Sequence, residues 1–134
     1  MNILVIDAQG GGIGRQVVSA IRKTFPQQHI VAVGTNSAAT SAMLKAGADD
    51  AATGENAVVV CCRTADVIIG PVGIVIADAL LGEITPRMAV AVGQSRAKRI
   101  LIPGNHCDNH IAGAGDMSMA GLIESVVGTL RGLL

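Results

Sequence analysis

Glycines gather directly after the first apolar run of the chain, in a pattern that suits the binding of an anion. The run Ile3 to Ile6 is followed by Gly10 to Gly14, where four of the five residues are glycine. A turn needs only one glycine, so the excess indicates a backbone that a ligand approaches closely, and amides at the start of a helix attract anions. The alternative is a glycine-rich turn that serves only the packing of a helix on a strand. The residues predicted to hold a phosphate are Gln9, Gly10, Gly11, Gly12, Ile13, Gly14 and Arg15.

This glycine loop departs from each standard phosphate-binding fingerprint. In the G-x-G-x-x-G pattern the last glycine would fall on Arg15, and in the pattern of the short-chain dehydrogenases the first would fall on Ala8. No Lys-Ser or Lys-Thr pair follows Gly14, which excludes a Walker A loop. The chain has no tyrosine, so the tyrosine-lysine proton relay of the short-chain dehydrogenases is absent.

A second polar loop follows the apolar run 29–33. Proteins that bind NAD usually place Asp or Glu there to hold the ribose hydroxyls, whereas this chain has Gly34-Thr35-Asn36-Ser37. The missing carboxylate weakens an assignment to NAD and leaves room for the 2′-phosphate of NADP, a mononucleotide or another small anion. We expect a phosphate-bearing nucleotide such as NADP. A second phosphate or ribose is assigned to Thr35, Asn36 and Ser37, and the ring of the ligand to Gly70, Pro71 and Gly73.

Metal-ligating and nucleophilic side chains cluster near the C-terminal end, at His106, Cys107, Asp108 and His110. These residue types suit zinc, nickel or iron, and a cysteine beside a histidine also occurs in nucleophile–base pairs. Adjacent residues on a loop rarely point to the same place, so we favour a polar loop that lines the ligand pocket, with Asn105 against the ligand. A metal- or thiol-dependent small enzyme is the alternative.

Isolated carboxylates are the remaining candidates for chemistry. Asp7 follows the first apolar run, where it can bond to the loop amides or face a ligand or Mg²⁺. Asp78 interrupts an apolar stretch and is expected either in solvent or at the pocket edge, and Glu55 and Glu83 are interpreted as ordinary helix-end charges. No pair of carboxylates has a spacing that favours acid–base catalysis.

The elements that position these residues alternate regularly between strand and helix, five times over. This order predicts an α/β fold: a three-layer, Rossmann-like, doubly wound single domain over residues 1–134, with a mainly parallel sheet of about five strands. Its polar loops all follow strands, so they share one edge of the sheet. Strands are predicted within 3–6, 29–33, 50–53, 67–69 and 99–102. Helices are predicted after Gly14, from a cap at Ser37, from Thr53 or Asn56, over Ile74 to Ile84, from Thr85-Pro86 and from a cap at Ser118.

Composition narrows the class of protein further. Half of the residues are hydrophobic and 1% are aromatic, which predicts an aliphatic core, and Cys61 and Cys62 are expected inside it as small core residues. Ten basic and ten acidic residues cancel without a basic cluster, so we expect no nucleic-acid partner. No apolar run is long enough to cross a membrane, and three cysteines suggest no disulfide framework. We expect a cytoplasmic protein that forms a homo-oligomer through a helix face such as 74–84.

Several phrases of the chain are distinctive. They are NILVID at 2–7, GGGIGRQ at 10–16, VGTNS at 33–37, MLKAGAD at 43–49, ATGENAVVV at 52–60, LLGEITP at 80–86 and ILIPGNHCDN at 100–109. These phrases resemble a family found in anaerobic, clostridia-like bacteria and labelled only as a domain of unknown function. The likeness covers nearly the whole chain, although Ala8 stands where that family usually has glycine. The resemblance implies a bacterial cytoplasmic protein and transfers no activity.

Three functions stay open from the sequence. The favoured one is a small nucleotide- or dinucleotide-binding protein of unassigned reaction, with a small phosphorylated molecule as its partner. The second is the metal- or thiol-dependent enzyme, and the third is a non-catalytic homo-oligomeric assembly or regulatory module.

Overall fold

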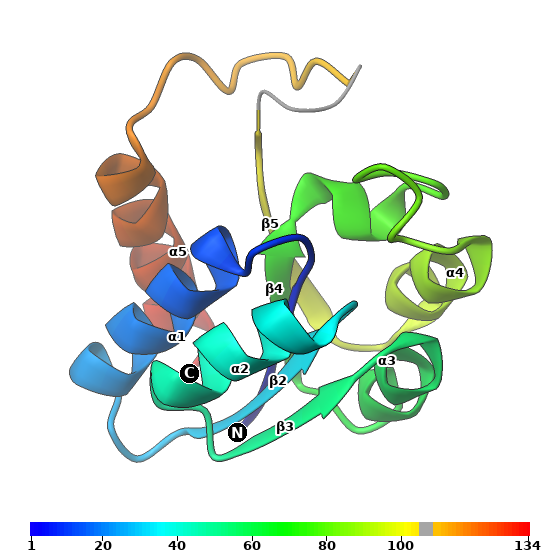
Figure 1. Ribbon diagram of the computed structural model, residues 1–134. Helices are drawn as coiled ribbons and strands as arrows, with labels where there is room; N and C mark the ends of the chain where they lie inside the picture. The colour runs from blue at the N-terminus through cyan, green and yellow to red at the C-terminus, as the bar shows by residue number, and fades with distance from the viewer. Residues whose placement is uncertain (105–108) are drawn as a thin grey trace.

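The computed structural model describes residues 1–104 and 109–134 and contains a five-stranded sheet in which every pair of neighbouring strands is parallel (Figure 1). The strand order is β3-β2-β1-β4-β5. The predicted α/β, Rossmann-like class is therefore confirmed. The strands are β1 (Asn2–Asp7), β2 (His29–Gly34), β3 (Asp50–Thr53), β4 (Val67–Pro71) and β5 (Lys98–Ile102).

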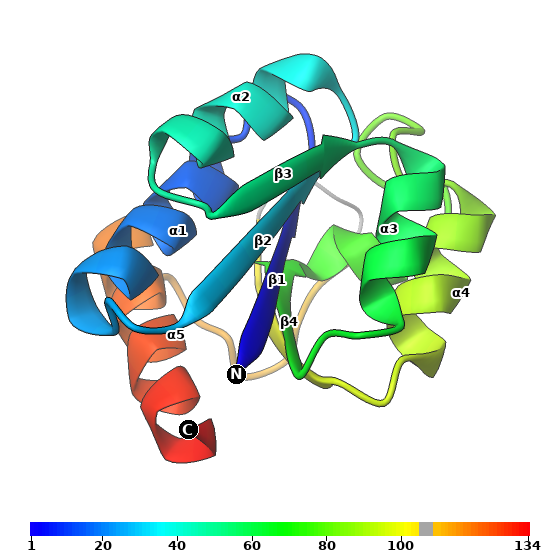
Figure 2. The same ribbon diagram turned by 90° about the horizontal axis from the view of Figure 1, so that it is seen from below.

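Helices cover both faces of the sheet, which gives three layers (Figure 2). One face carries α1 (Gly12–Thr24), α2 (Ser37–Lys45) and α5 (Met119–Leu133), and the other carries α3 (Glu55–Cys62) and α4 (Pro86–Gln94). Successive side chains of a strand point to opposite faces. In β1, Ile3 and Val5 accordingly join the core under α1, while Leu4 and Ile6 join the core under α3 and α4.

Capping residues start three of the helices. Asn36 accepts a hydrogen bond from the amide of Ala39, so the cap of α2 is Asn36 and the expected cap Ser37 is the first helical residue. Thr85 and Ser118 cap α4 and α5 as predicted. Helix α3 begins after Gly54, which has a φ of 103°, and neither Thr53 nor Asn56 is its cap. The side-chain oxygens of Asn36, Thr85 and Ser118 accept hydrogen bonds from amides that a helix start leaves unpaired.

The helix predicted over Ile74 to Ile84 does not form. A short 3-10 helix, η1 (Val72–Val75), is followed by turns over residues 76–85, which we call the 76–85 loop. Asp78, Leu80 and Leu81 have positive φ values of 66°, 57° and 59°, a backbone conformation that is incompatible with a right-handed helix. Ile74 and Ile84 are both buried, so the apolar residues at the two ends of this stretch fix η1 and the end of the 76–85 loop in the core. Leu81, which lies at helical spacing from Ile74 and Ile84, is 96% exposed.

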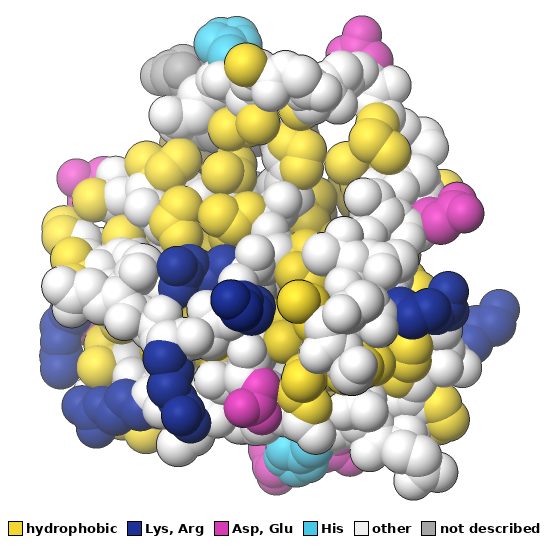
Figure 3. Space-filling model, turned by 180° about the vertical axis from the view of Figure 1, so that it is seen from behind, with side chains coloured by type: hydrophobic (Ala, Val, Ile, Leu, Met, Phe, Trp, Pro, Cys, Tyr) yellow, Lys and Arg dark blue, Asp and Glu magenta, His cyan; other side chains and the backbone are white. Residues whose placement is uncertain are grey.

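The outer surface mixes charged and apolar side chains. Figure 3, seen from the side opposite to that of Figure 1, shows Lys and Arg spread over the middle of the molecule with hydrophobic side chains gathered above them. Within residues 1–104 and 109–134, no helix combines the length and the apolar character needed to span a bilayer.

Candidate functional site

A cavity of about 970 Å³ opens at the carboxyl edge of the sheet, and we call it the edge cavity. The strand order reverses between β1 and β4, and in open parallel sheets the crevice at such a reversal is the usual ligand site. Asp7 and Pro71, at the ends of β1 and β4, and Pro103, directly after β5, line the cavity, and residues 109–111 and 114–119 line it as well. This segment passes above the sheet edge before it enters α5 (Figure 1).

The structure brings some of the predicted site residues to the edge cavity and places the others elsewhere. Those that line it are Gln9, Gly10, Gly12, Ile13 and Pro71, together with His110. Those that do not line it are Gly11, Gly14, Arg15, Thr35, Asn36, Ser37, Gly70 and Gly73. Asn105, His106, Cys107 and Asp108 lie outside the described residues. In the part of the chain that the structure describes, no three His, Cys, Asp or Glu side chains group as metal ligands would.

Two glycines of the loop serve the packing of α1. Gly11 has a φ of 73°, and a Cβ there would lie 2.9 Å from the Cα of Ala39 in α2. A Cβ at Gly14 would lie 2.6 Å from the sulfur of Met43 and 2.8 Å from the Cβ of Asp7. For these two positions, close packing of α1 on α2 and β1 is sufficient to require glycine.

Gly10 and Gly12 have no such structural requirement. Neither has a positive φ, and a Cβ at either position would meet no atom within 4 Å. Both are exposed and line the edge cavity. Their amides donate to no atom in the described parts of the chain. The glycines that packing does not require are thus the ones that line the edge cavity.

Asp7 binds the amides that surround the glycine loop. Its carboxylate accepts hydrogen bonds from the amide of Gly14 at 2.6 Å and from that of Ala8 at 2.8 Å, and the residue is 4% exposed. Burial raises the pKa of Asp7, the amides of Gly14, Ala8 and Ile13 act in the opposite direction, and the charge of Glu83 raises it further. Asp7 therefore binds loop amides, as expected from the sequence, and it also lines the cavity.

Glu83 joins the glycine loop to the end of β2, and the sequence interpretation as a helix-end charge is wrong. Its Oε1 accepts hydrogen bonds from the amide of Gln9 at 3.0 Å, the hydroxyl of Thr35 at 2.6 Å and Nδ2 of Asn36 at 2.8 Å. The hydroxyl of Thr35 is the largest cause that lowers the pKa of Glu83, and burial opposes it. Gln9, which supplies the amide, has a left-handed backbone with a φ of 52°. A carboxylate therefore stands beside the end of β2 although the loop there contains none.

No local sequence signal marks Glu83 as part of this site. Its three donors are 47 to 74 positions away along the chain. Asn36 also donates Nδ2 to the carbonyl of Gln9 at 2.9 Å, so the two loops are linked a second time. Thr35 and Asn36, which were expected to hold the ligand, bond to atoms of the chain itself.

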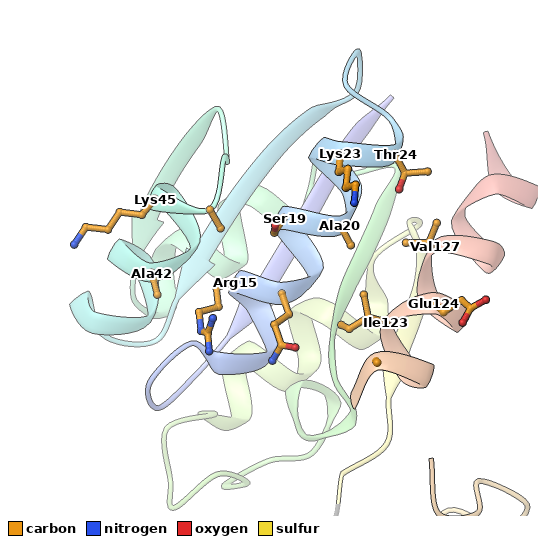
Figure 4. Close-up of a pocket in the computed structure, with 13 residues that line it drawn as sticks. Arg15, Ser19, Ala20, Lys23, Thr24, Ala42, Lys45, Ile123, Glu124 and Val127 are labelled. Atoms are coloured by element: carbon orange, nitrogen blue, oxygen red, sulfur yellow. The ribbon is translucent and has the colours of Figure 1, made fainter. Parts of the chain in front are cut away.

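Arg15 lies in a second groove, of about 760 Å³, between α1, α2 and α5 (Figure 4). The groove also holds Lys23 and Lys45, and its single acidic side chain among the described lining residues is Glu124. Arg15 is exposed, does not line the edge cavity, and extends toward the N-terminal start of α1 (Figure 4).

Cys61 and Cys62 lie in or against the hydrophobic core. Cys62 is 3% exposed in the core under α3, as expected, and Cys61 packs partly buried beside it. Burial, with a smaller contribution from Cys61, raises the pKa of Cys62 to about 11. A thiol with so high a pKa is a poor nucleophile at neutral pH.

Solved structures resemble this chain in fold. The dodecameric FMN-dependent Ubix-like decarboxylase from Escherichia coli O157:H7 aligns with a TM-score of 0.46 and 19% identity, over 99% of this chain and 76% of that one. A nucleoside-diphosphate-sugar epimerase from Pseudomonas aeruginosa aligns with a TM-score of 0.51 and 14% identity, over 99% of this chain. This chain spans 48% of the epimerase chain, and a likeness at this identity shows a shared fold only.

Sequence comparison identifies the family. No curated protein matches the chain. A family model matches residues 2–134, and thus nearly every residue. The chain belongs to the family described as a domain of unknown function (DUF3842).

Proposed function

We propose that the protein binds a phosphorylated small molecule, of nucleotide type, in the edge cavity, with a phosphate on the amides of Gly10 and Gly12. The observation that carries this proposal is the contrast among the loop glycines. Gly11 and Gly14 are required by packing, whereas Gly10 and Gly12 face open space in the cavity. A glycine that the fold does not need is explained when a ligand must reach the backbone.

The charge distribution around α1 supports a phosphate at this position. The amide of Gly12 belongs to the first turn of α1, where the helix dipole is positive and favours an anion. The N-cap residue of α1 is Gly11, which has no side chain to cap the amide of Gly12. Asp7 takes the amide of Gly14 and leaves those of Gly10 and Gly12 to the ligand.

The remainder of the cavity suits an apolar ring or chain. Pro71, Leu80 and Leu122 line it, together with Met117 before α5 and Met119 at the start of α5. Its volume of about 970 Å³ falls within the range of roughly 300–1,000 Å³ that small-molecule sites occupy. The proposal covers binding and leaves the reaction open.

Alanine variants of the loop test this function. We expect Gly10→Ala and Gly12→Ala to fold with nearly unchanged stability, because the new methyl group meets no neighbour within 4 Å. They should bind nucleotides at least tenfold more weakly, since the methyl group holds the phosphate away from the amides. Calorimetric titration with inorganic phosphate, AMP, FMN, NAD and NADP measures the loss.

Gly128→Ala is the matched control. Gly128 lies on α5, away from the cavity lining, and an added Cβ there also meets open space. Its binding should equal that of the unaltered protein. Equal affinities for the loop variants and the unaltered protein would contradict the proposal.

A further inference from the structure

We infer that Glu83 accepts hydrogen bonds from the ribose hydroxyls of a nucleotide bound at the glycine loop, so that the protein binds NAD in preference to NADP. This inference rests on the proposed function, in which a phosphate binds at the amides of Gly10 and Gly12. It reverses the expectation from the sequence, where the loop after β2 contains no carboxylate and NADP is therefore favoured.

The fold defines where the ribose of a dinucleotide lies. In a Rossmann-like sheet the pyrophosphate lies on the glycine loop, and an Asp or Glu at the end of the second strand accepts hydrogen bonds from the ribose hydroxyls. Here Gly34 ends β2, and Thr35 follows it. The amide of Thr35 donates to the carbonyl of Asp7 at 3.1 Å, so the end of β2 lies directly beside the end of β1. A carboxylate that binds a ribose is therefore expected next to Thr35.

Glu83 reaches this position from the loop after β4. Its Oε1 lies 2.6 Å from the hydroxyl of Thr35 and 2.8 Å from Nδ2 of Asn36. The same oxygen lies 3.0 Å from the amide nitrogen of Gln9, which lines the edge cavity and directly precedes Gly10. Glu83 itself is outside the cavity lining, between Gln9 and the residues after β2. A phosphate on Gly10 and a ribose on Glu83 therefore lie at neighbouring residues of the loop, a separation that one nucleotide can bridge.

One oxygen of Glu83 is left for a ligand. All three hydrogen bonds end on Oε1, and no described residue donates to Oε2. Among the described residues, the buried side-chain oxygens without a hydrogen-bond partner are Oδ1 of Asn2 and Oε1 of Gln28. Oε2 of Glu83 is absent from this set although it has no partner, so it is open to solvent. Oε1 thus fixes the carboxylate, and Oε2 can accept from a ribose.

Asp7 and Glu55 also stand near the end of β2, but the oxygens of both are engaged. Asp7 ends β1 and Glu55 follows β3, which are the strands on either side of β2. The two oxygens of Asp7 accept from loop amides. In Glu55, Oε1 accepts from the hydroxyl of Thr85 at 2.6 Å and Oε2 lies 3.8 Å from Nη1 of Arg87. Of these three carboxylates, Glu83 is the one with an oxygen to spare.

The charge of Glu83 favours a hydroxyl and disfavours a phosphate. Its pKa lies below the ordinary value, chiefly because the hydroxyl of Thr35 donates to it, so the carboxylate is ionised at neutral pH. The ion pairs among the described residues do not include Glu83, so none of them neutralises its charge. Ribose hydroxyls donate to a carboxylate in charge-assisted hydrogen bonds, which are stronger than those between neutral groups. A 2′-phosphate would instead place two negative charges close together, and these repel.

The loop around Glu83 holds the carboxylate in place before a ligand binds. Ile84, the next residue, is buried, and its carbonyl accepts a hydrogen bond from the amide of Asp78 at 2.7 Å, which closes the loop. The left-handed residues Leu80 and Leu81 carry a conformational cost that persists only where the surrounding contacts determine the backbone. A carboxylate that is already positioned loses little freedom on binding, and this favours affinity.

Two ligand pairs test the inference by calorimetric titration at pH 7.5. NAD and NADP differ only in the 2′-phosphate, and AMP and 2′-deoxy-AMP differ only in the 2′-hydroxyl. We expect NAD to bind at least tenfold more tightly than NADP, and AMP at least threefold more tightly than its deoxy form. Glu83→Gln, which keeps the shape without the charge, should bring NAD and NADP within threefold of each other. Glu83→Ala, which removes both oxygens, should make AMP and 2′-deoxy-AMP bind equally.

Asp78→Asn is the control for charge, since Asp78 is exposed on the same loop and Asn tolerates its left-handed backbone. It should leave both affinity ratios unchanged, and thermal unfolding checks that every variant folds. If Glu83 only joined the two loops, its variants would weaken NAD and NADP alike and leave their ratio unchanged. That result would overturn the inference.

The remaining outcomes separate the inference from the proposed function. Equal or tighter binding of NADP by the unaltered protein would overturn the inference and leave the proposed function standing. Binding of inorganic phosphate or FMN without binding of NAD or AMP would do the same. If inorganic phosphate, FMN and all four nucleotides fail to bind, the proposed function fails and the inference falls with it.

Discussion

Asp7 is a buried carboxylate beside the place proposed for a bound anion, and its influence on that anion can be measured. It bonds to the amide of Ala8, directly after β1, and to that of Gly14 in the first turn of α1, and it lines the edge cavity. Its charge neutralises part of the positive potential that would otherwise attract a phosphate. Asp7 thus sets the strength of anion binding as well as the shape of the loop.

We predict that Asp7→Asn increases the affinity for inorganic phosphate by about tenfold, because a negative charge disappears from the cavity wall. Asn keeps an oxygen that can accept from one of the two amides. Titration calorimetry measures the affinity, and thermal unfolding checks that the variant folds. A loss of affinity would instead indicate that Asp7 contacts the ligand through a cation, which is the other role that its sequence position allowed.

At the scale of the elements, close contact between α1 and α2 depends on single glycines. Gly11 faces the backbone of Ala39, and Gly14 faces Met43 in α2 and the Cβ of Asp7 in β1. Neither the backbone of Ala39 nor the Cβ of Asp7 can move as easily as the flexible end of a side chain. An added methyl group should therefore destabilise the protein at either position.

We predict that Gly11→Ala lowers the free energy of unfolding by about 1–3 kcal/mol, through its positive φ and its 2.9 Å approach to Ala39. Gly12→Ala, one residue along, should change stability little. Urea unfolding followed by circular dichroism measures both. Equal losses for the two variants would mean that the contact between α1 and α2 is not the reason for Gly11.

Sequence patterns predicted these elements well where the pattern is local. The four-residue strand Asp50–Thr53 and the caps Thr85 and Ser118 follow from neighbouring residues, and they were predicted correctly. The helix predicted over Ile74 to Ile84 was wrong, because a spacing of apolar residues indicates which residues are buried but not the sign of their φ angles. The interpretation of Glu83 as a helix-end charge was wrong, because its hydrogen-bond donors are distant in the sequence and no local pattern of residues indicates them. The phosphate assignment to Gly10 and Gly12 stays a prediction.

At the scale of the whole molecule, shifted carboxyl groups determine how stability depends on pH. Hydrogen bonds from the amide of Ile30 and from Arg22 lower the pKa of Asp49, and the bond from Thr35 lowers that of Glu83. Stability from a lowered pKa is present above the ordinary value and is lost as pH falls. Asp7 acts in the opposite sense, since its pKa is raised and its ionisation disfavours the folded state.

We predict that the free energy of unfolding falls as the pH is lowered from about 5 toward 3, because among the described residues Asp49 and Glu83 act in this direction and Asp7 opposes them. Asp49→Asn should cost about 1 kcal/mol at pH 7 and make the decline shallower, since the variant has no charge to lose there. Urea unfolding at a series of pH values measures the slope. A variant with an unchanged slope would show that Asp49 does not contribute to it.

The strand order has a consequence for synthesis on the ribosome. The central strand β1 is made first and can pair with β2 as soon as His29–Gly34 emerges, but its other edge has no partner until Val67–Pro71 is made. While residues 8–66 are being translated, an apolar strand therefore exposes unpaired amides and carbonyls along one edge, and such an edge can pair with another chain.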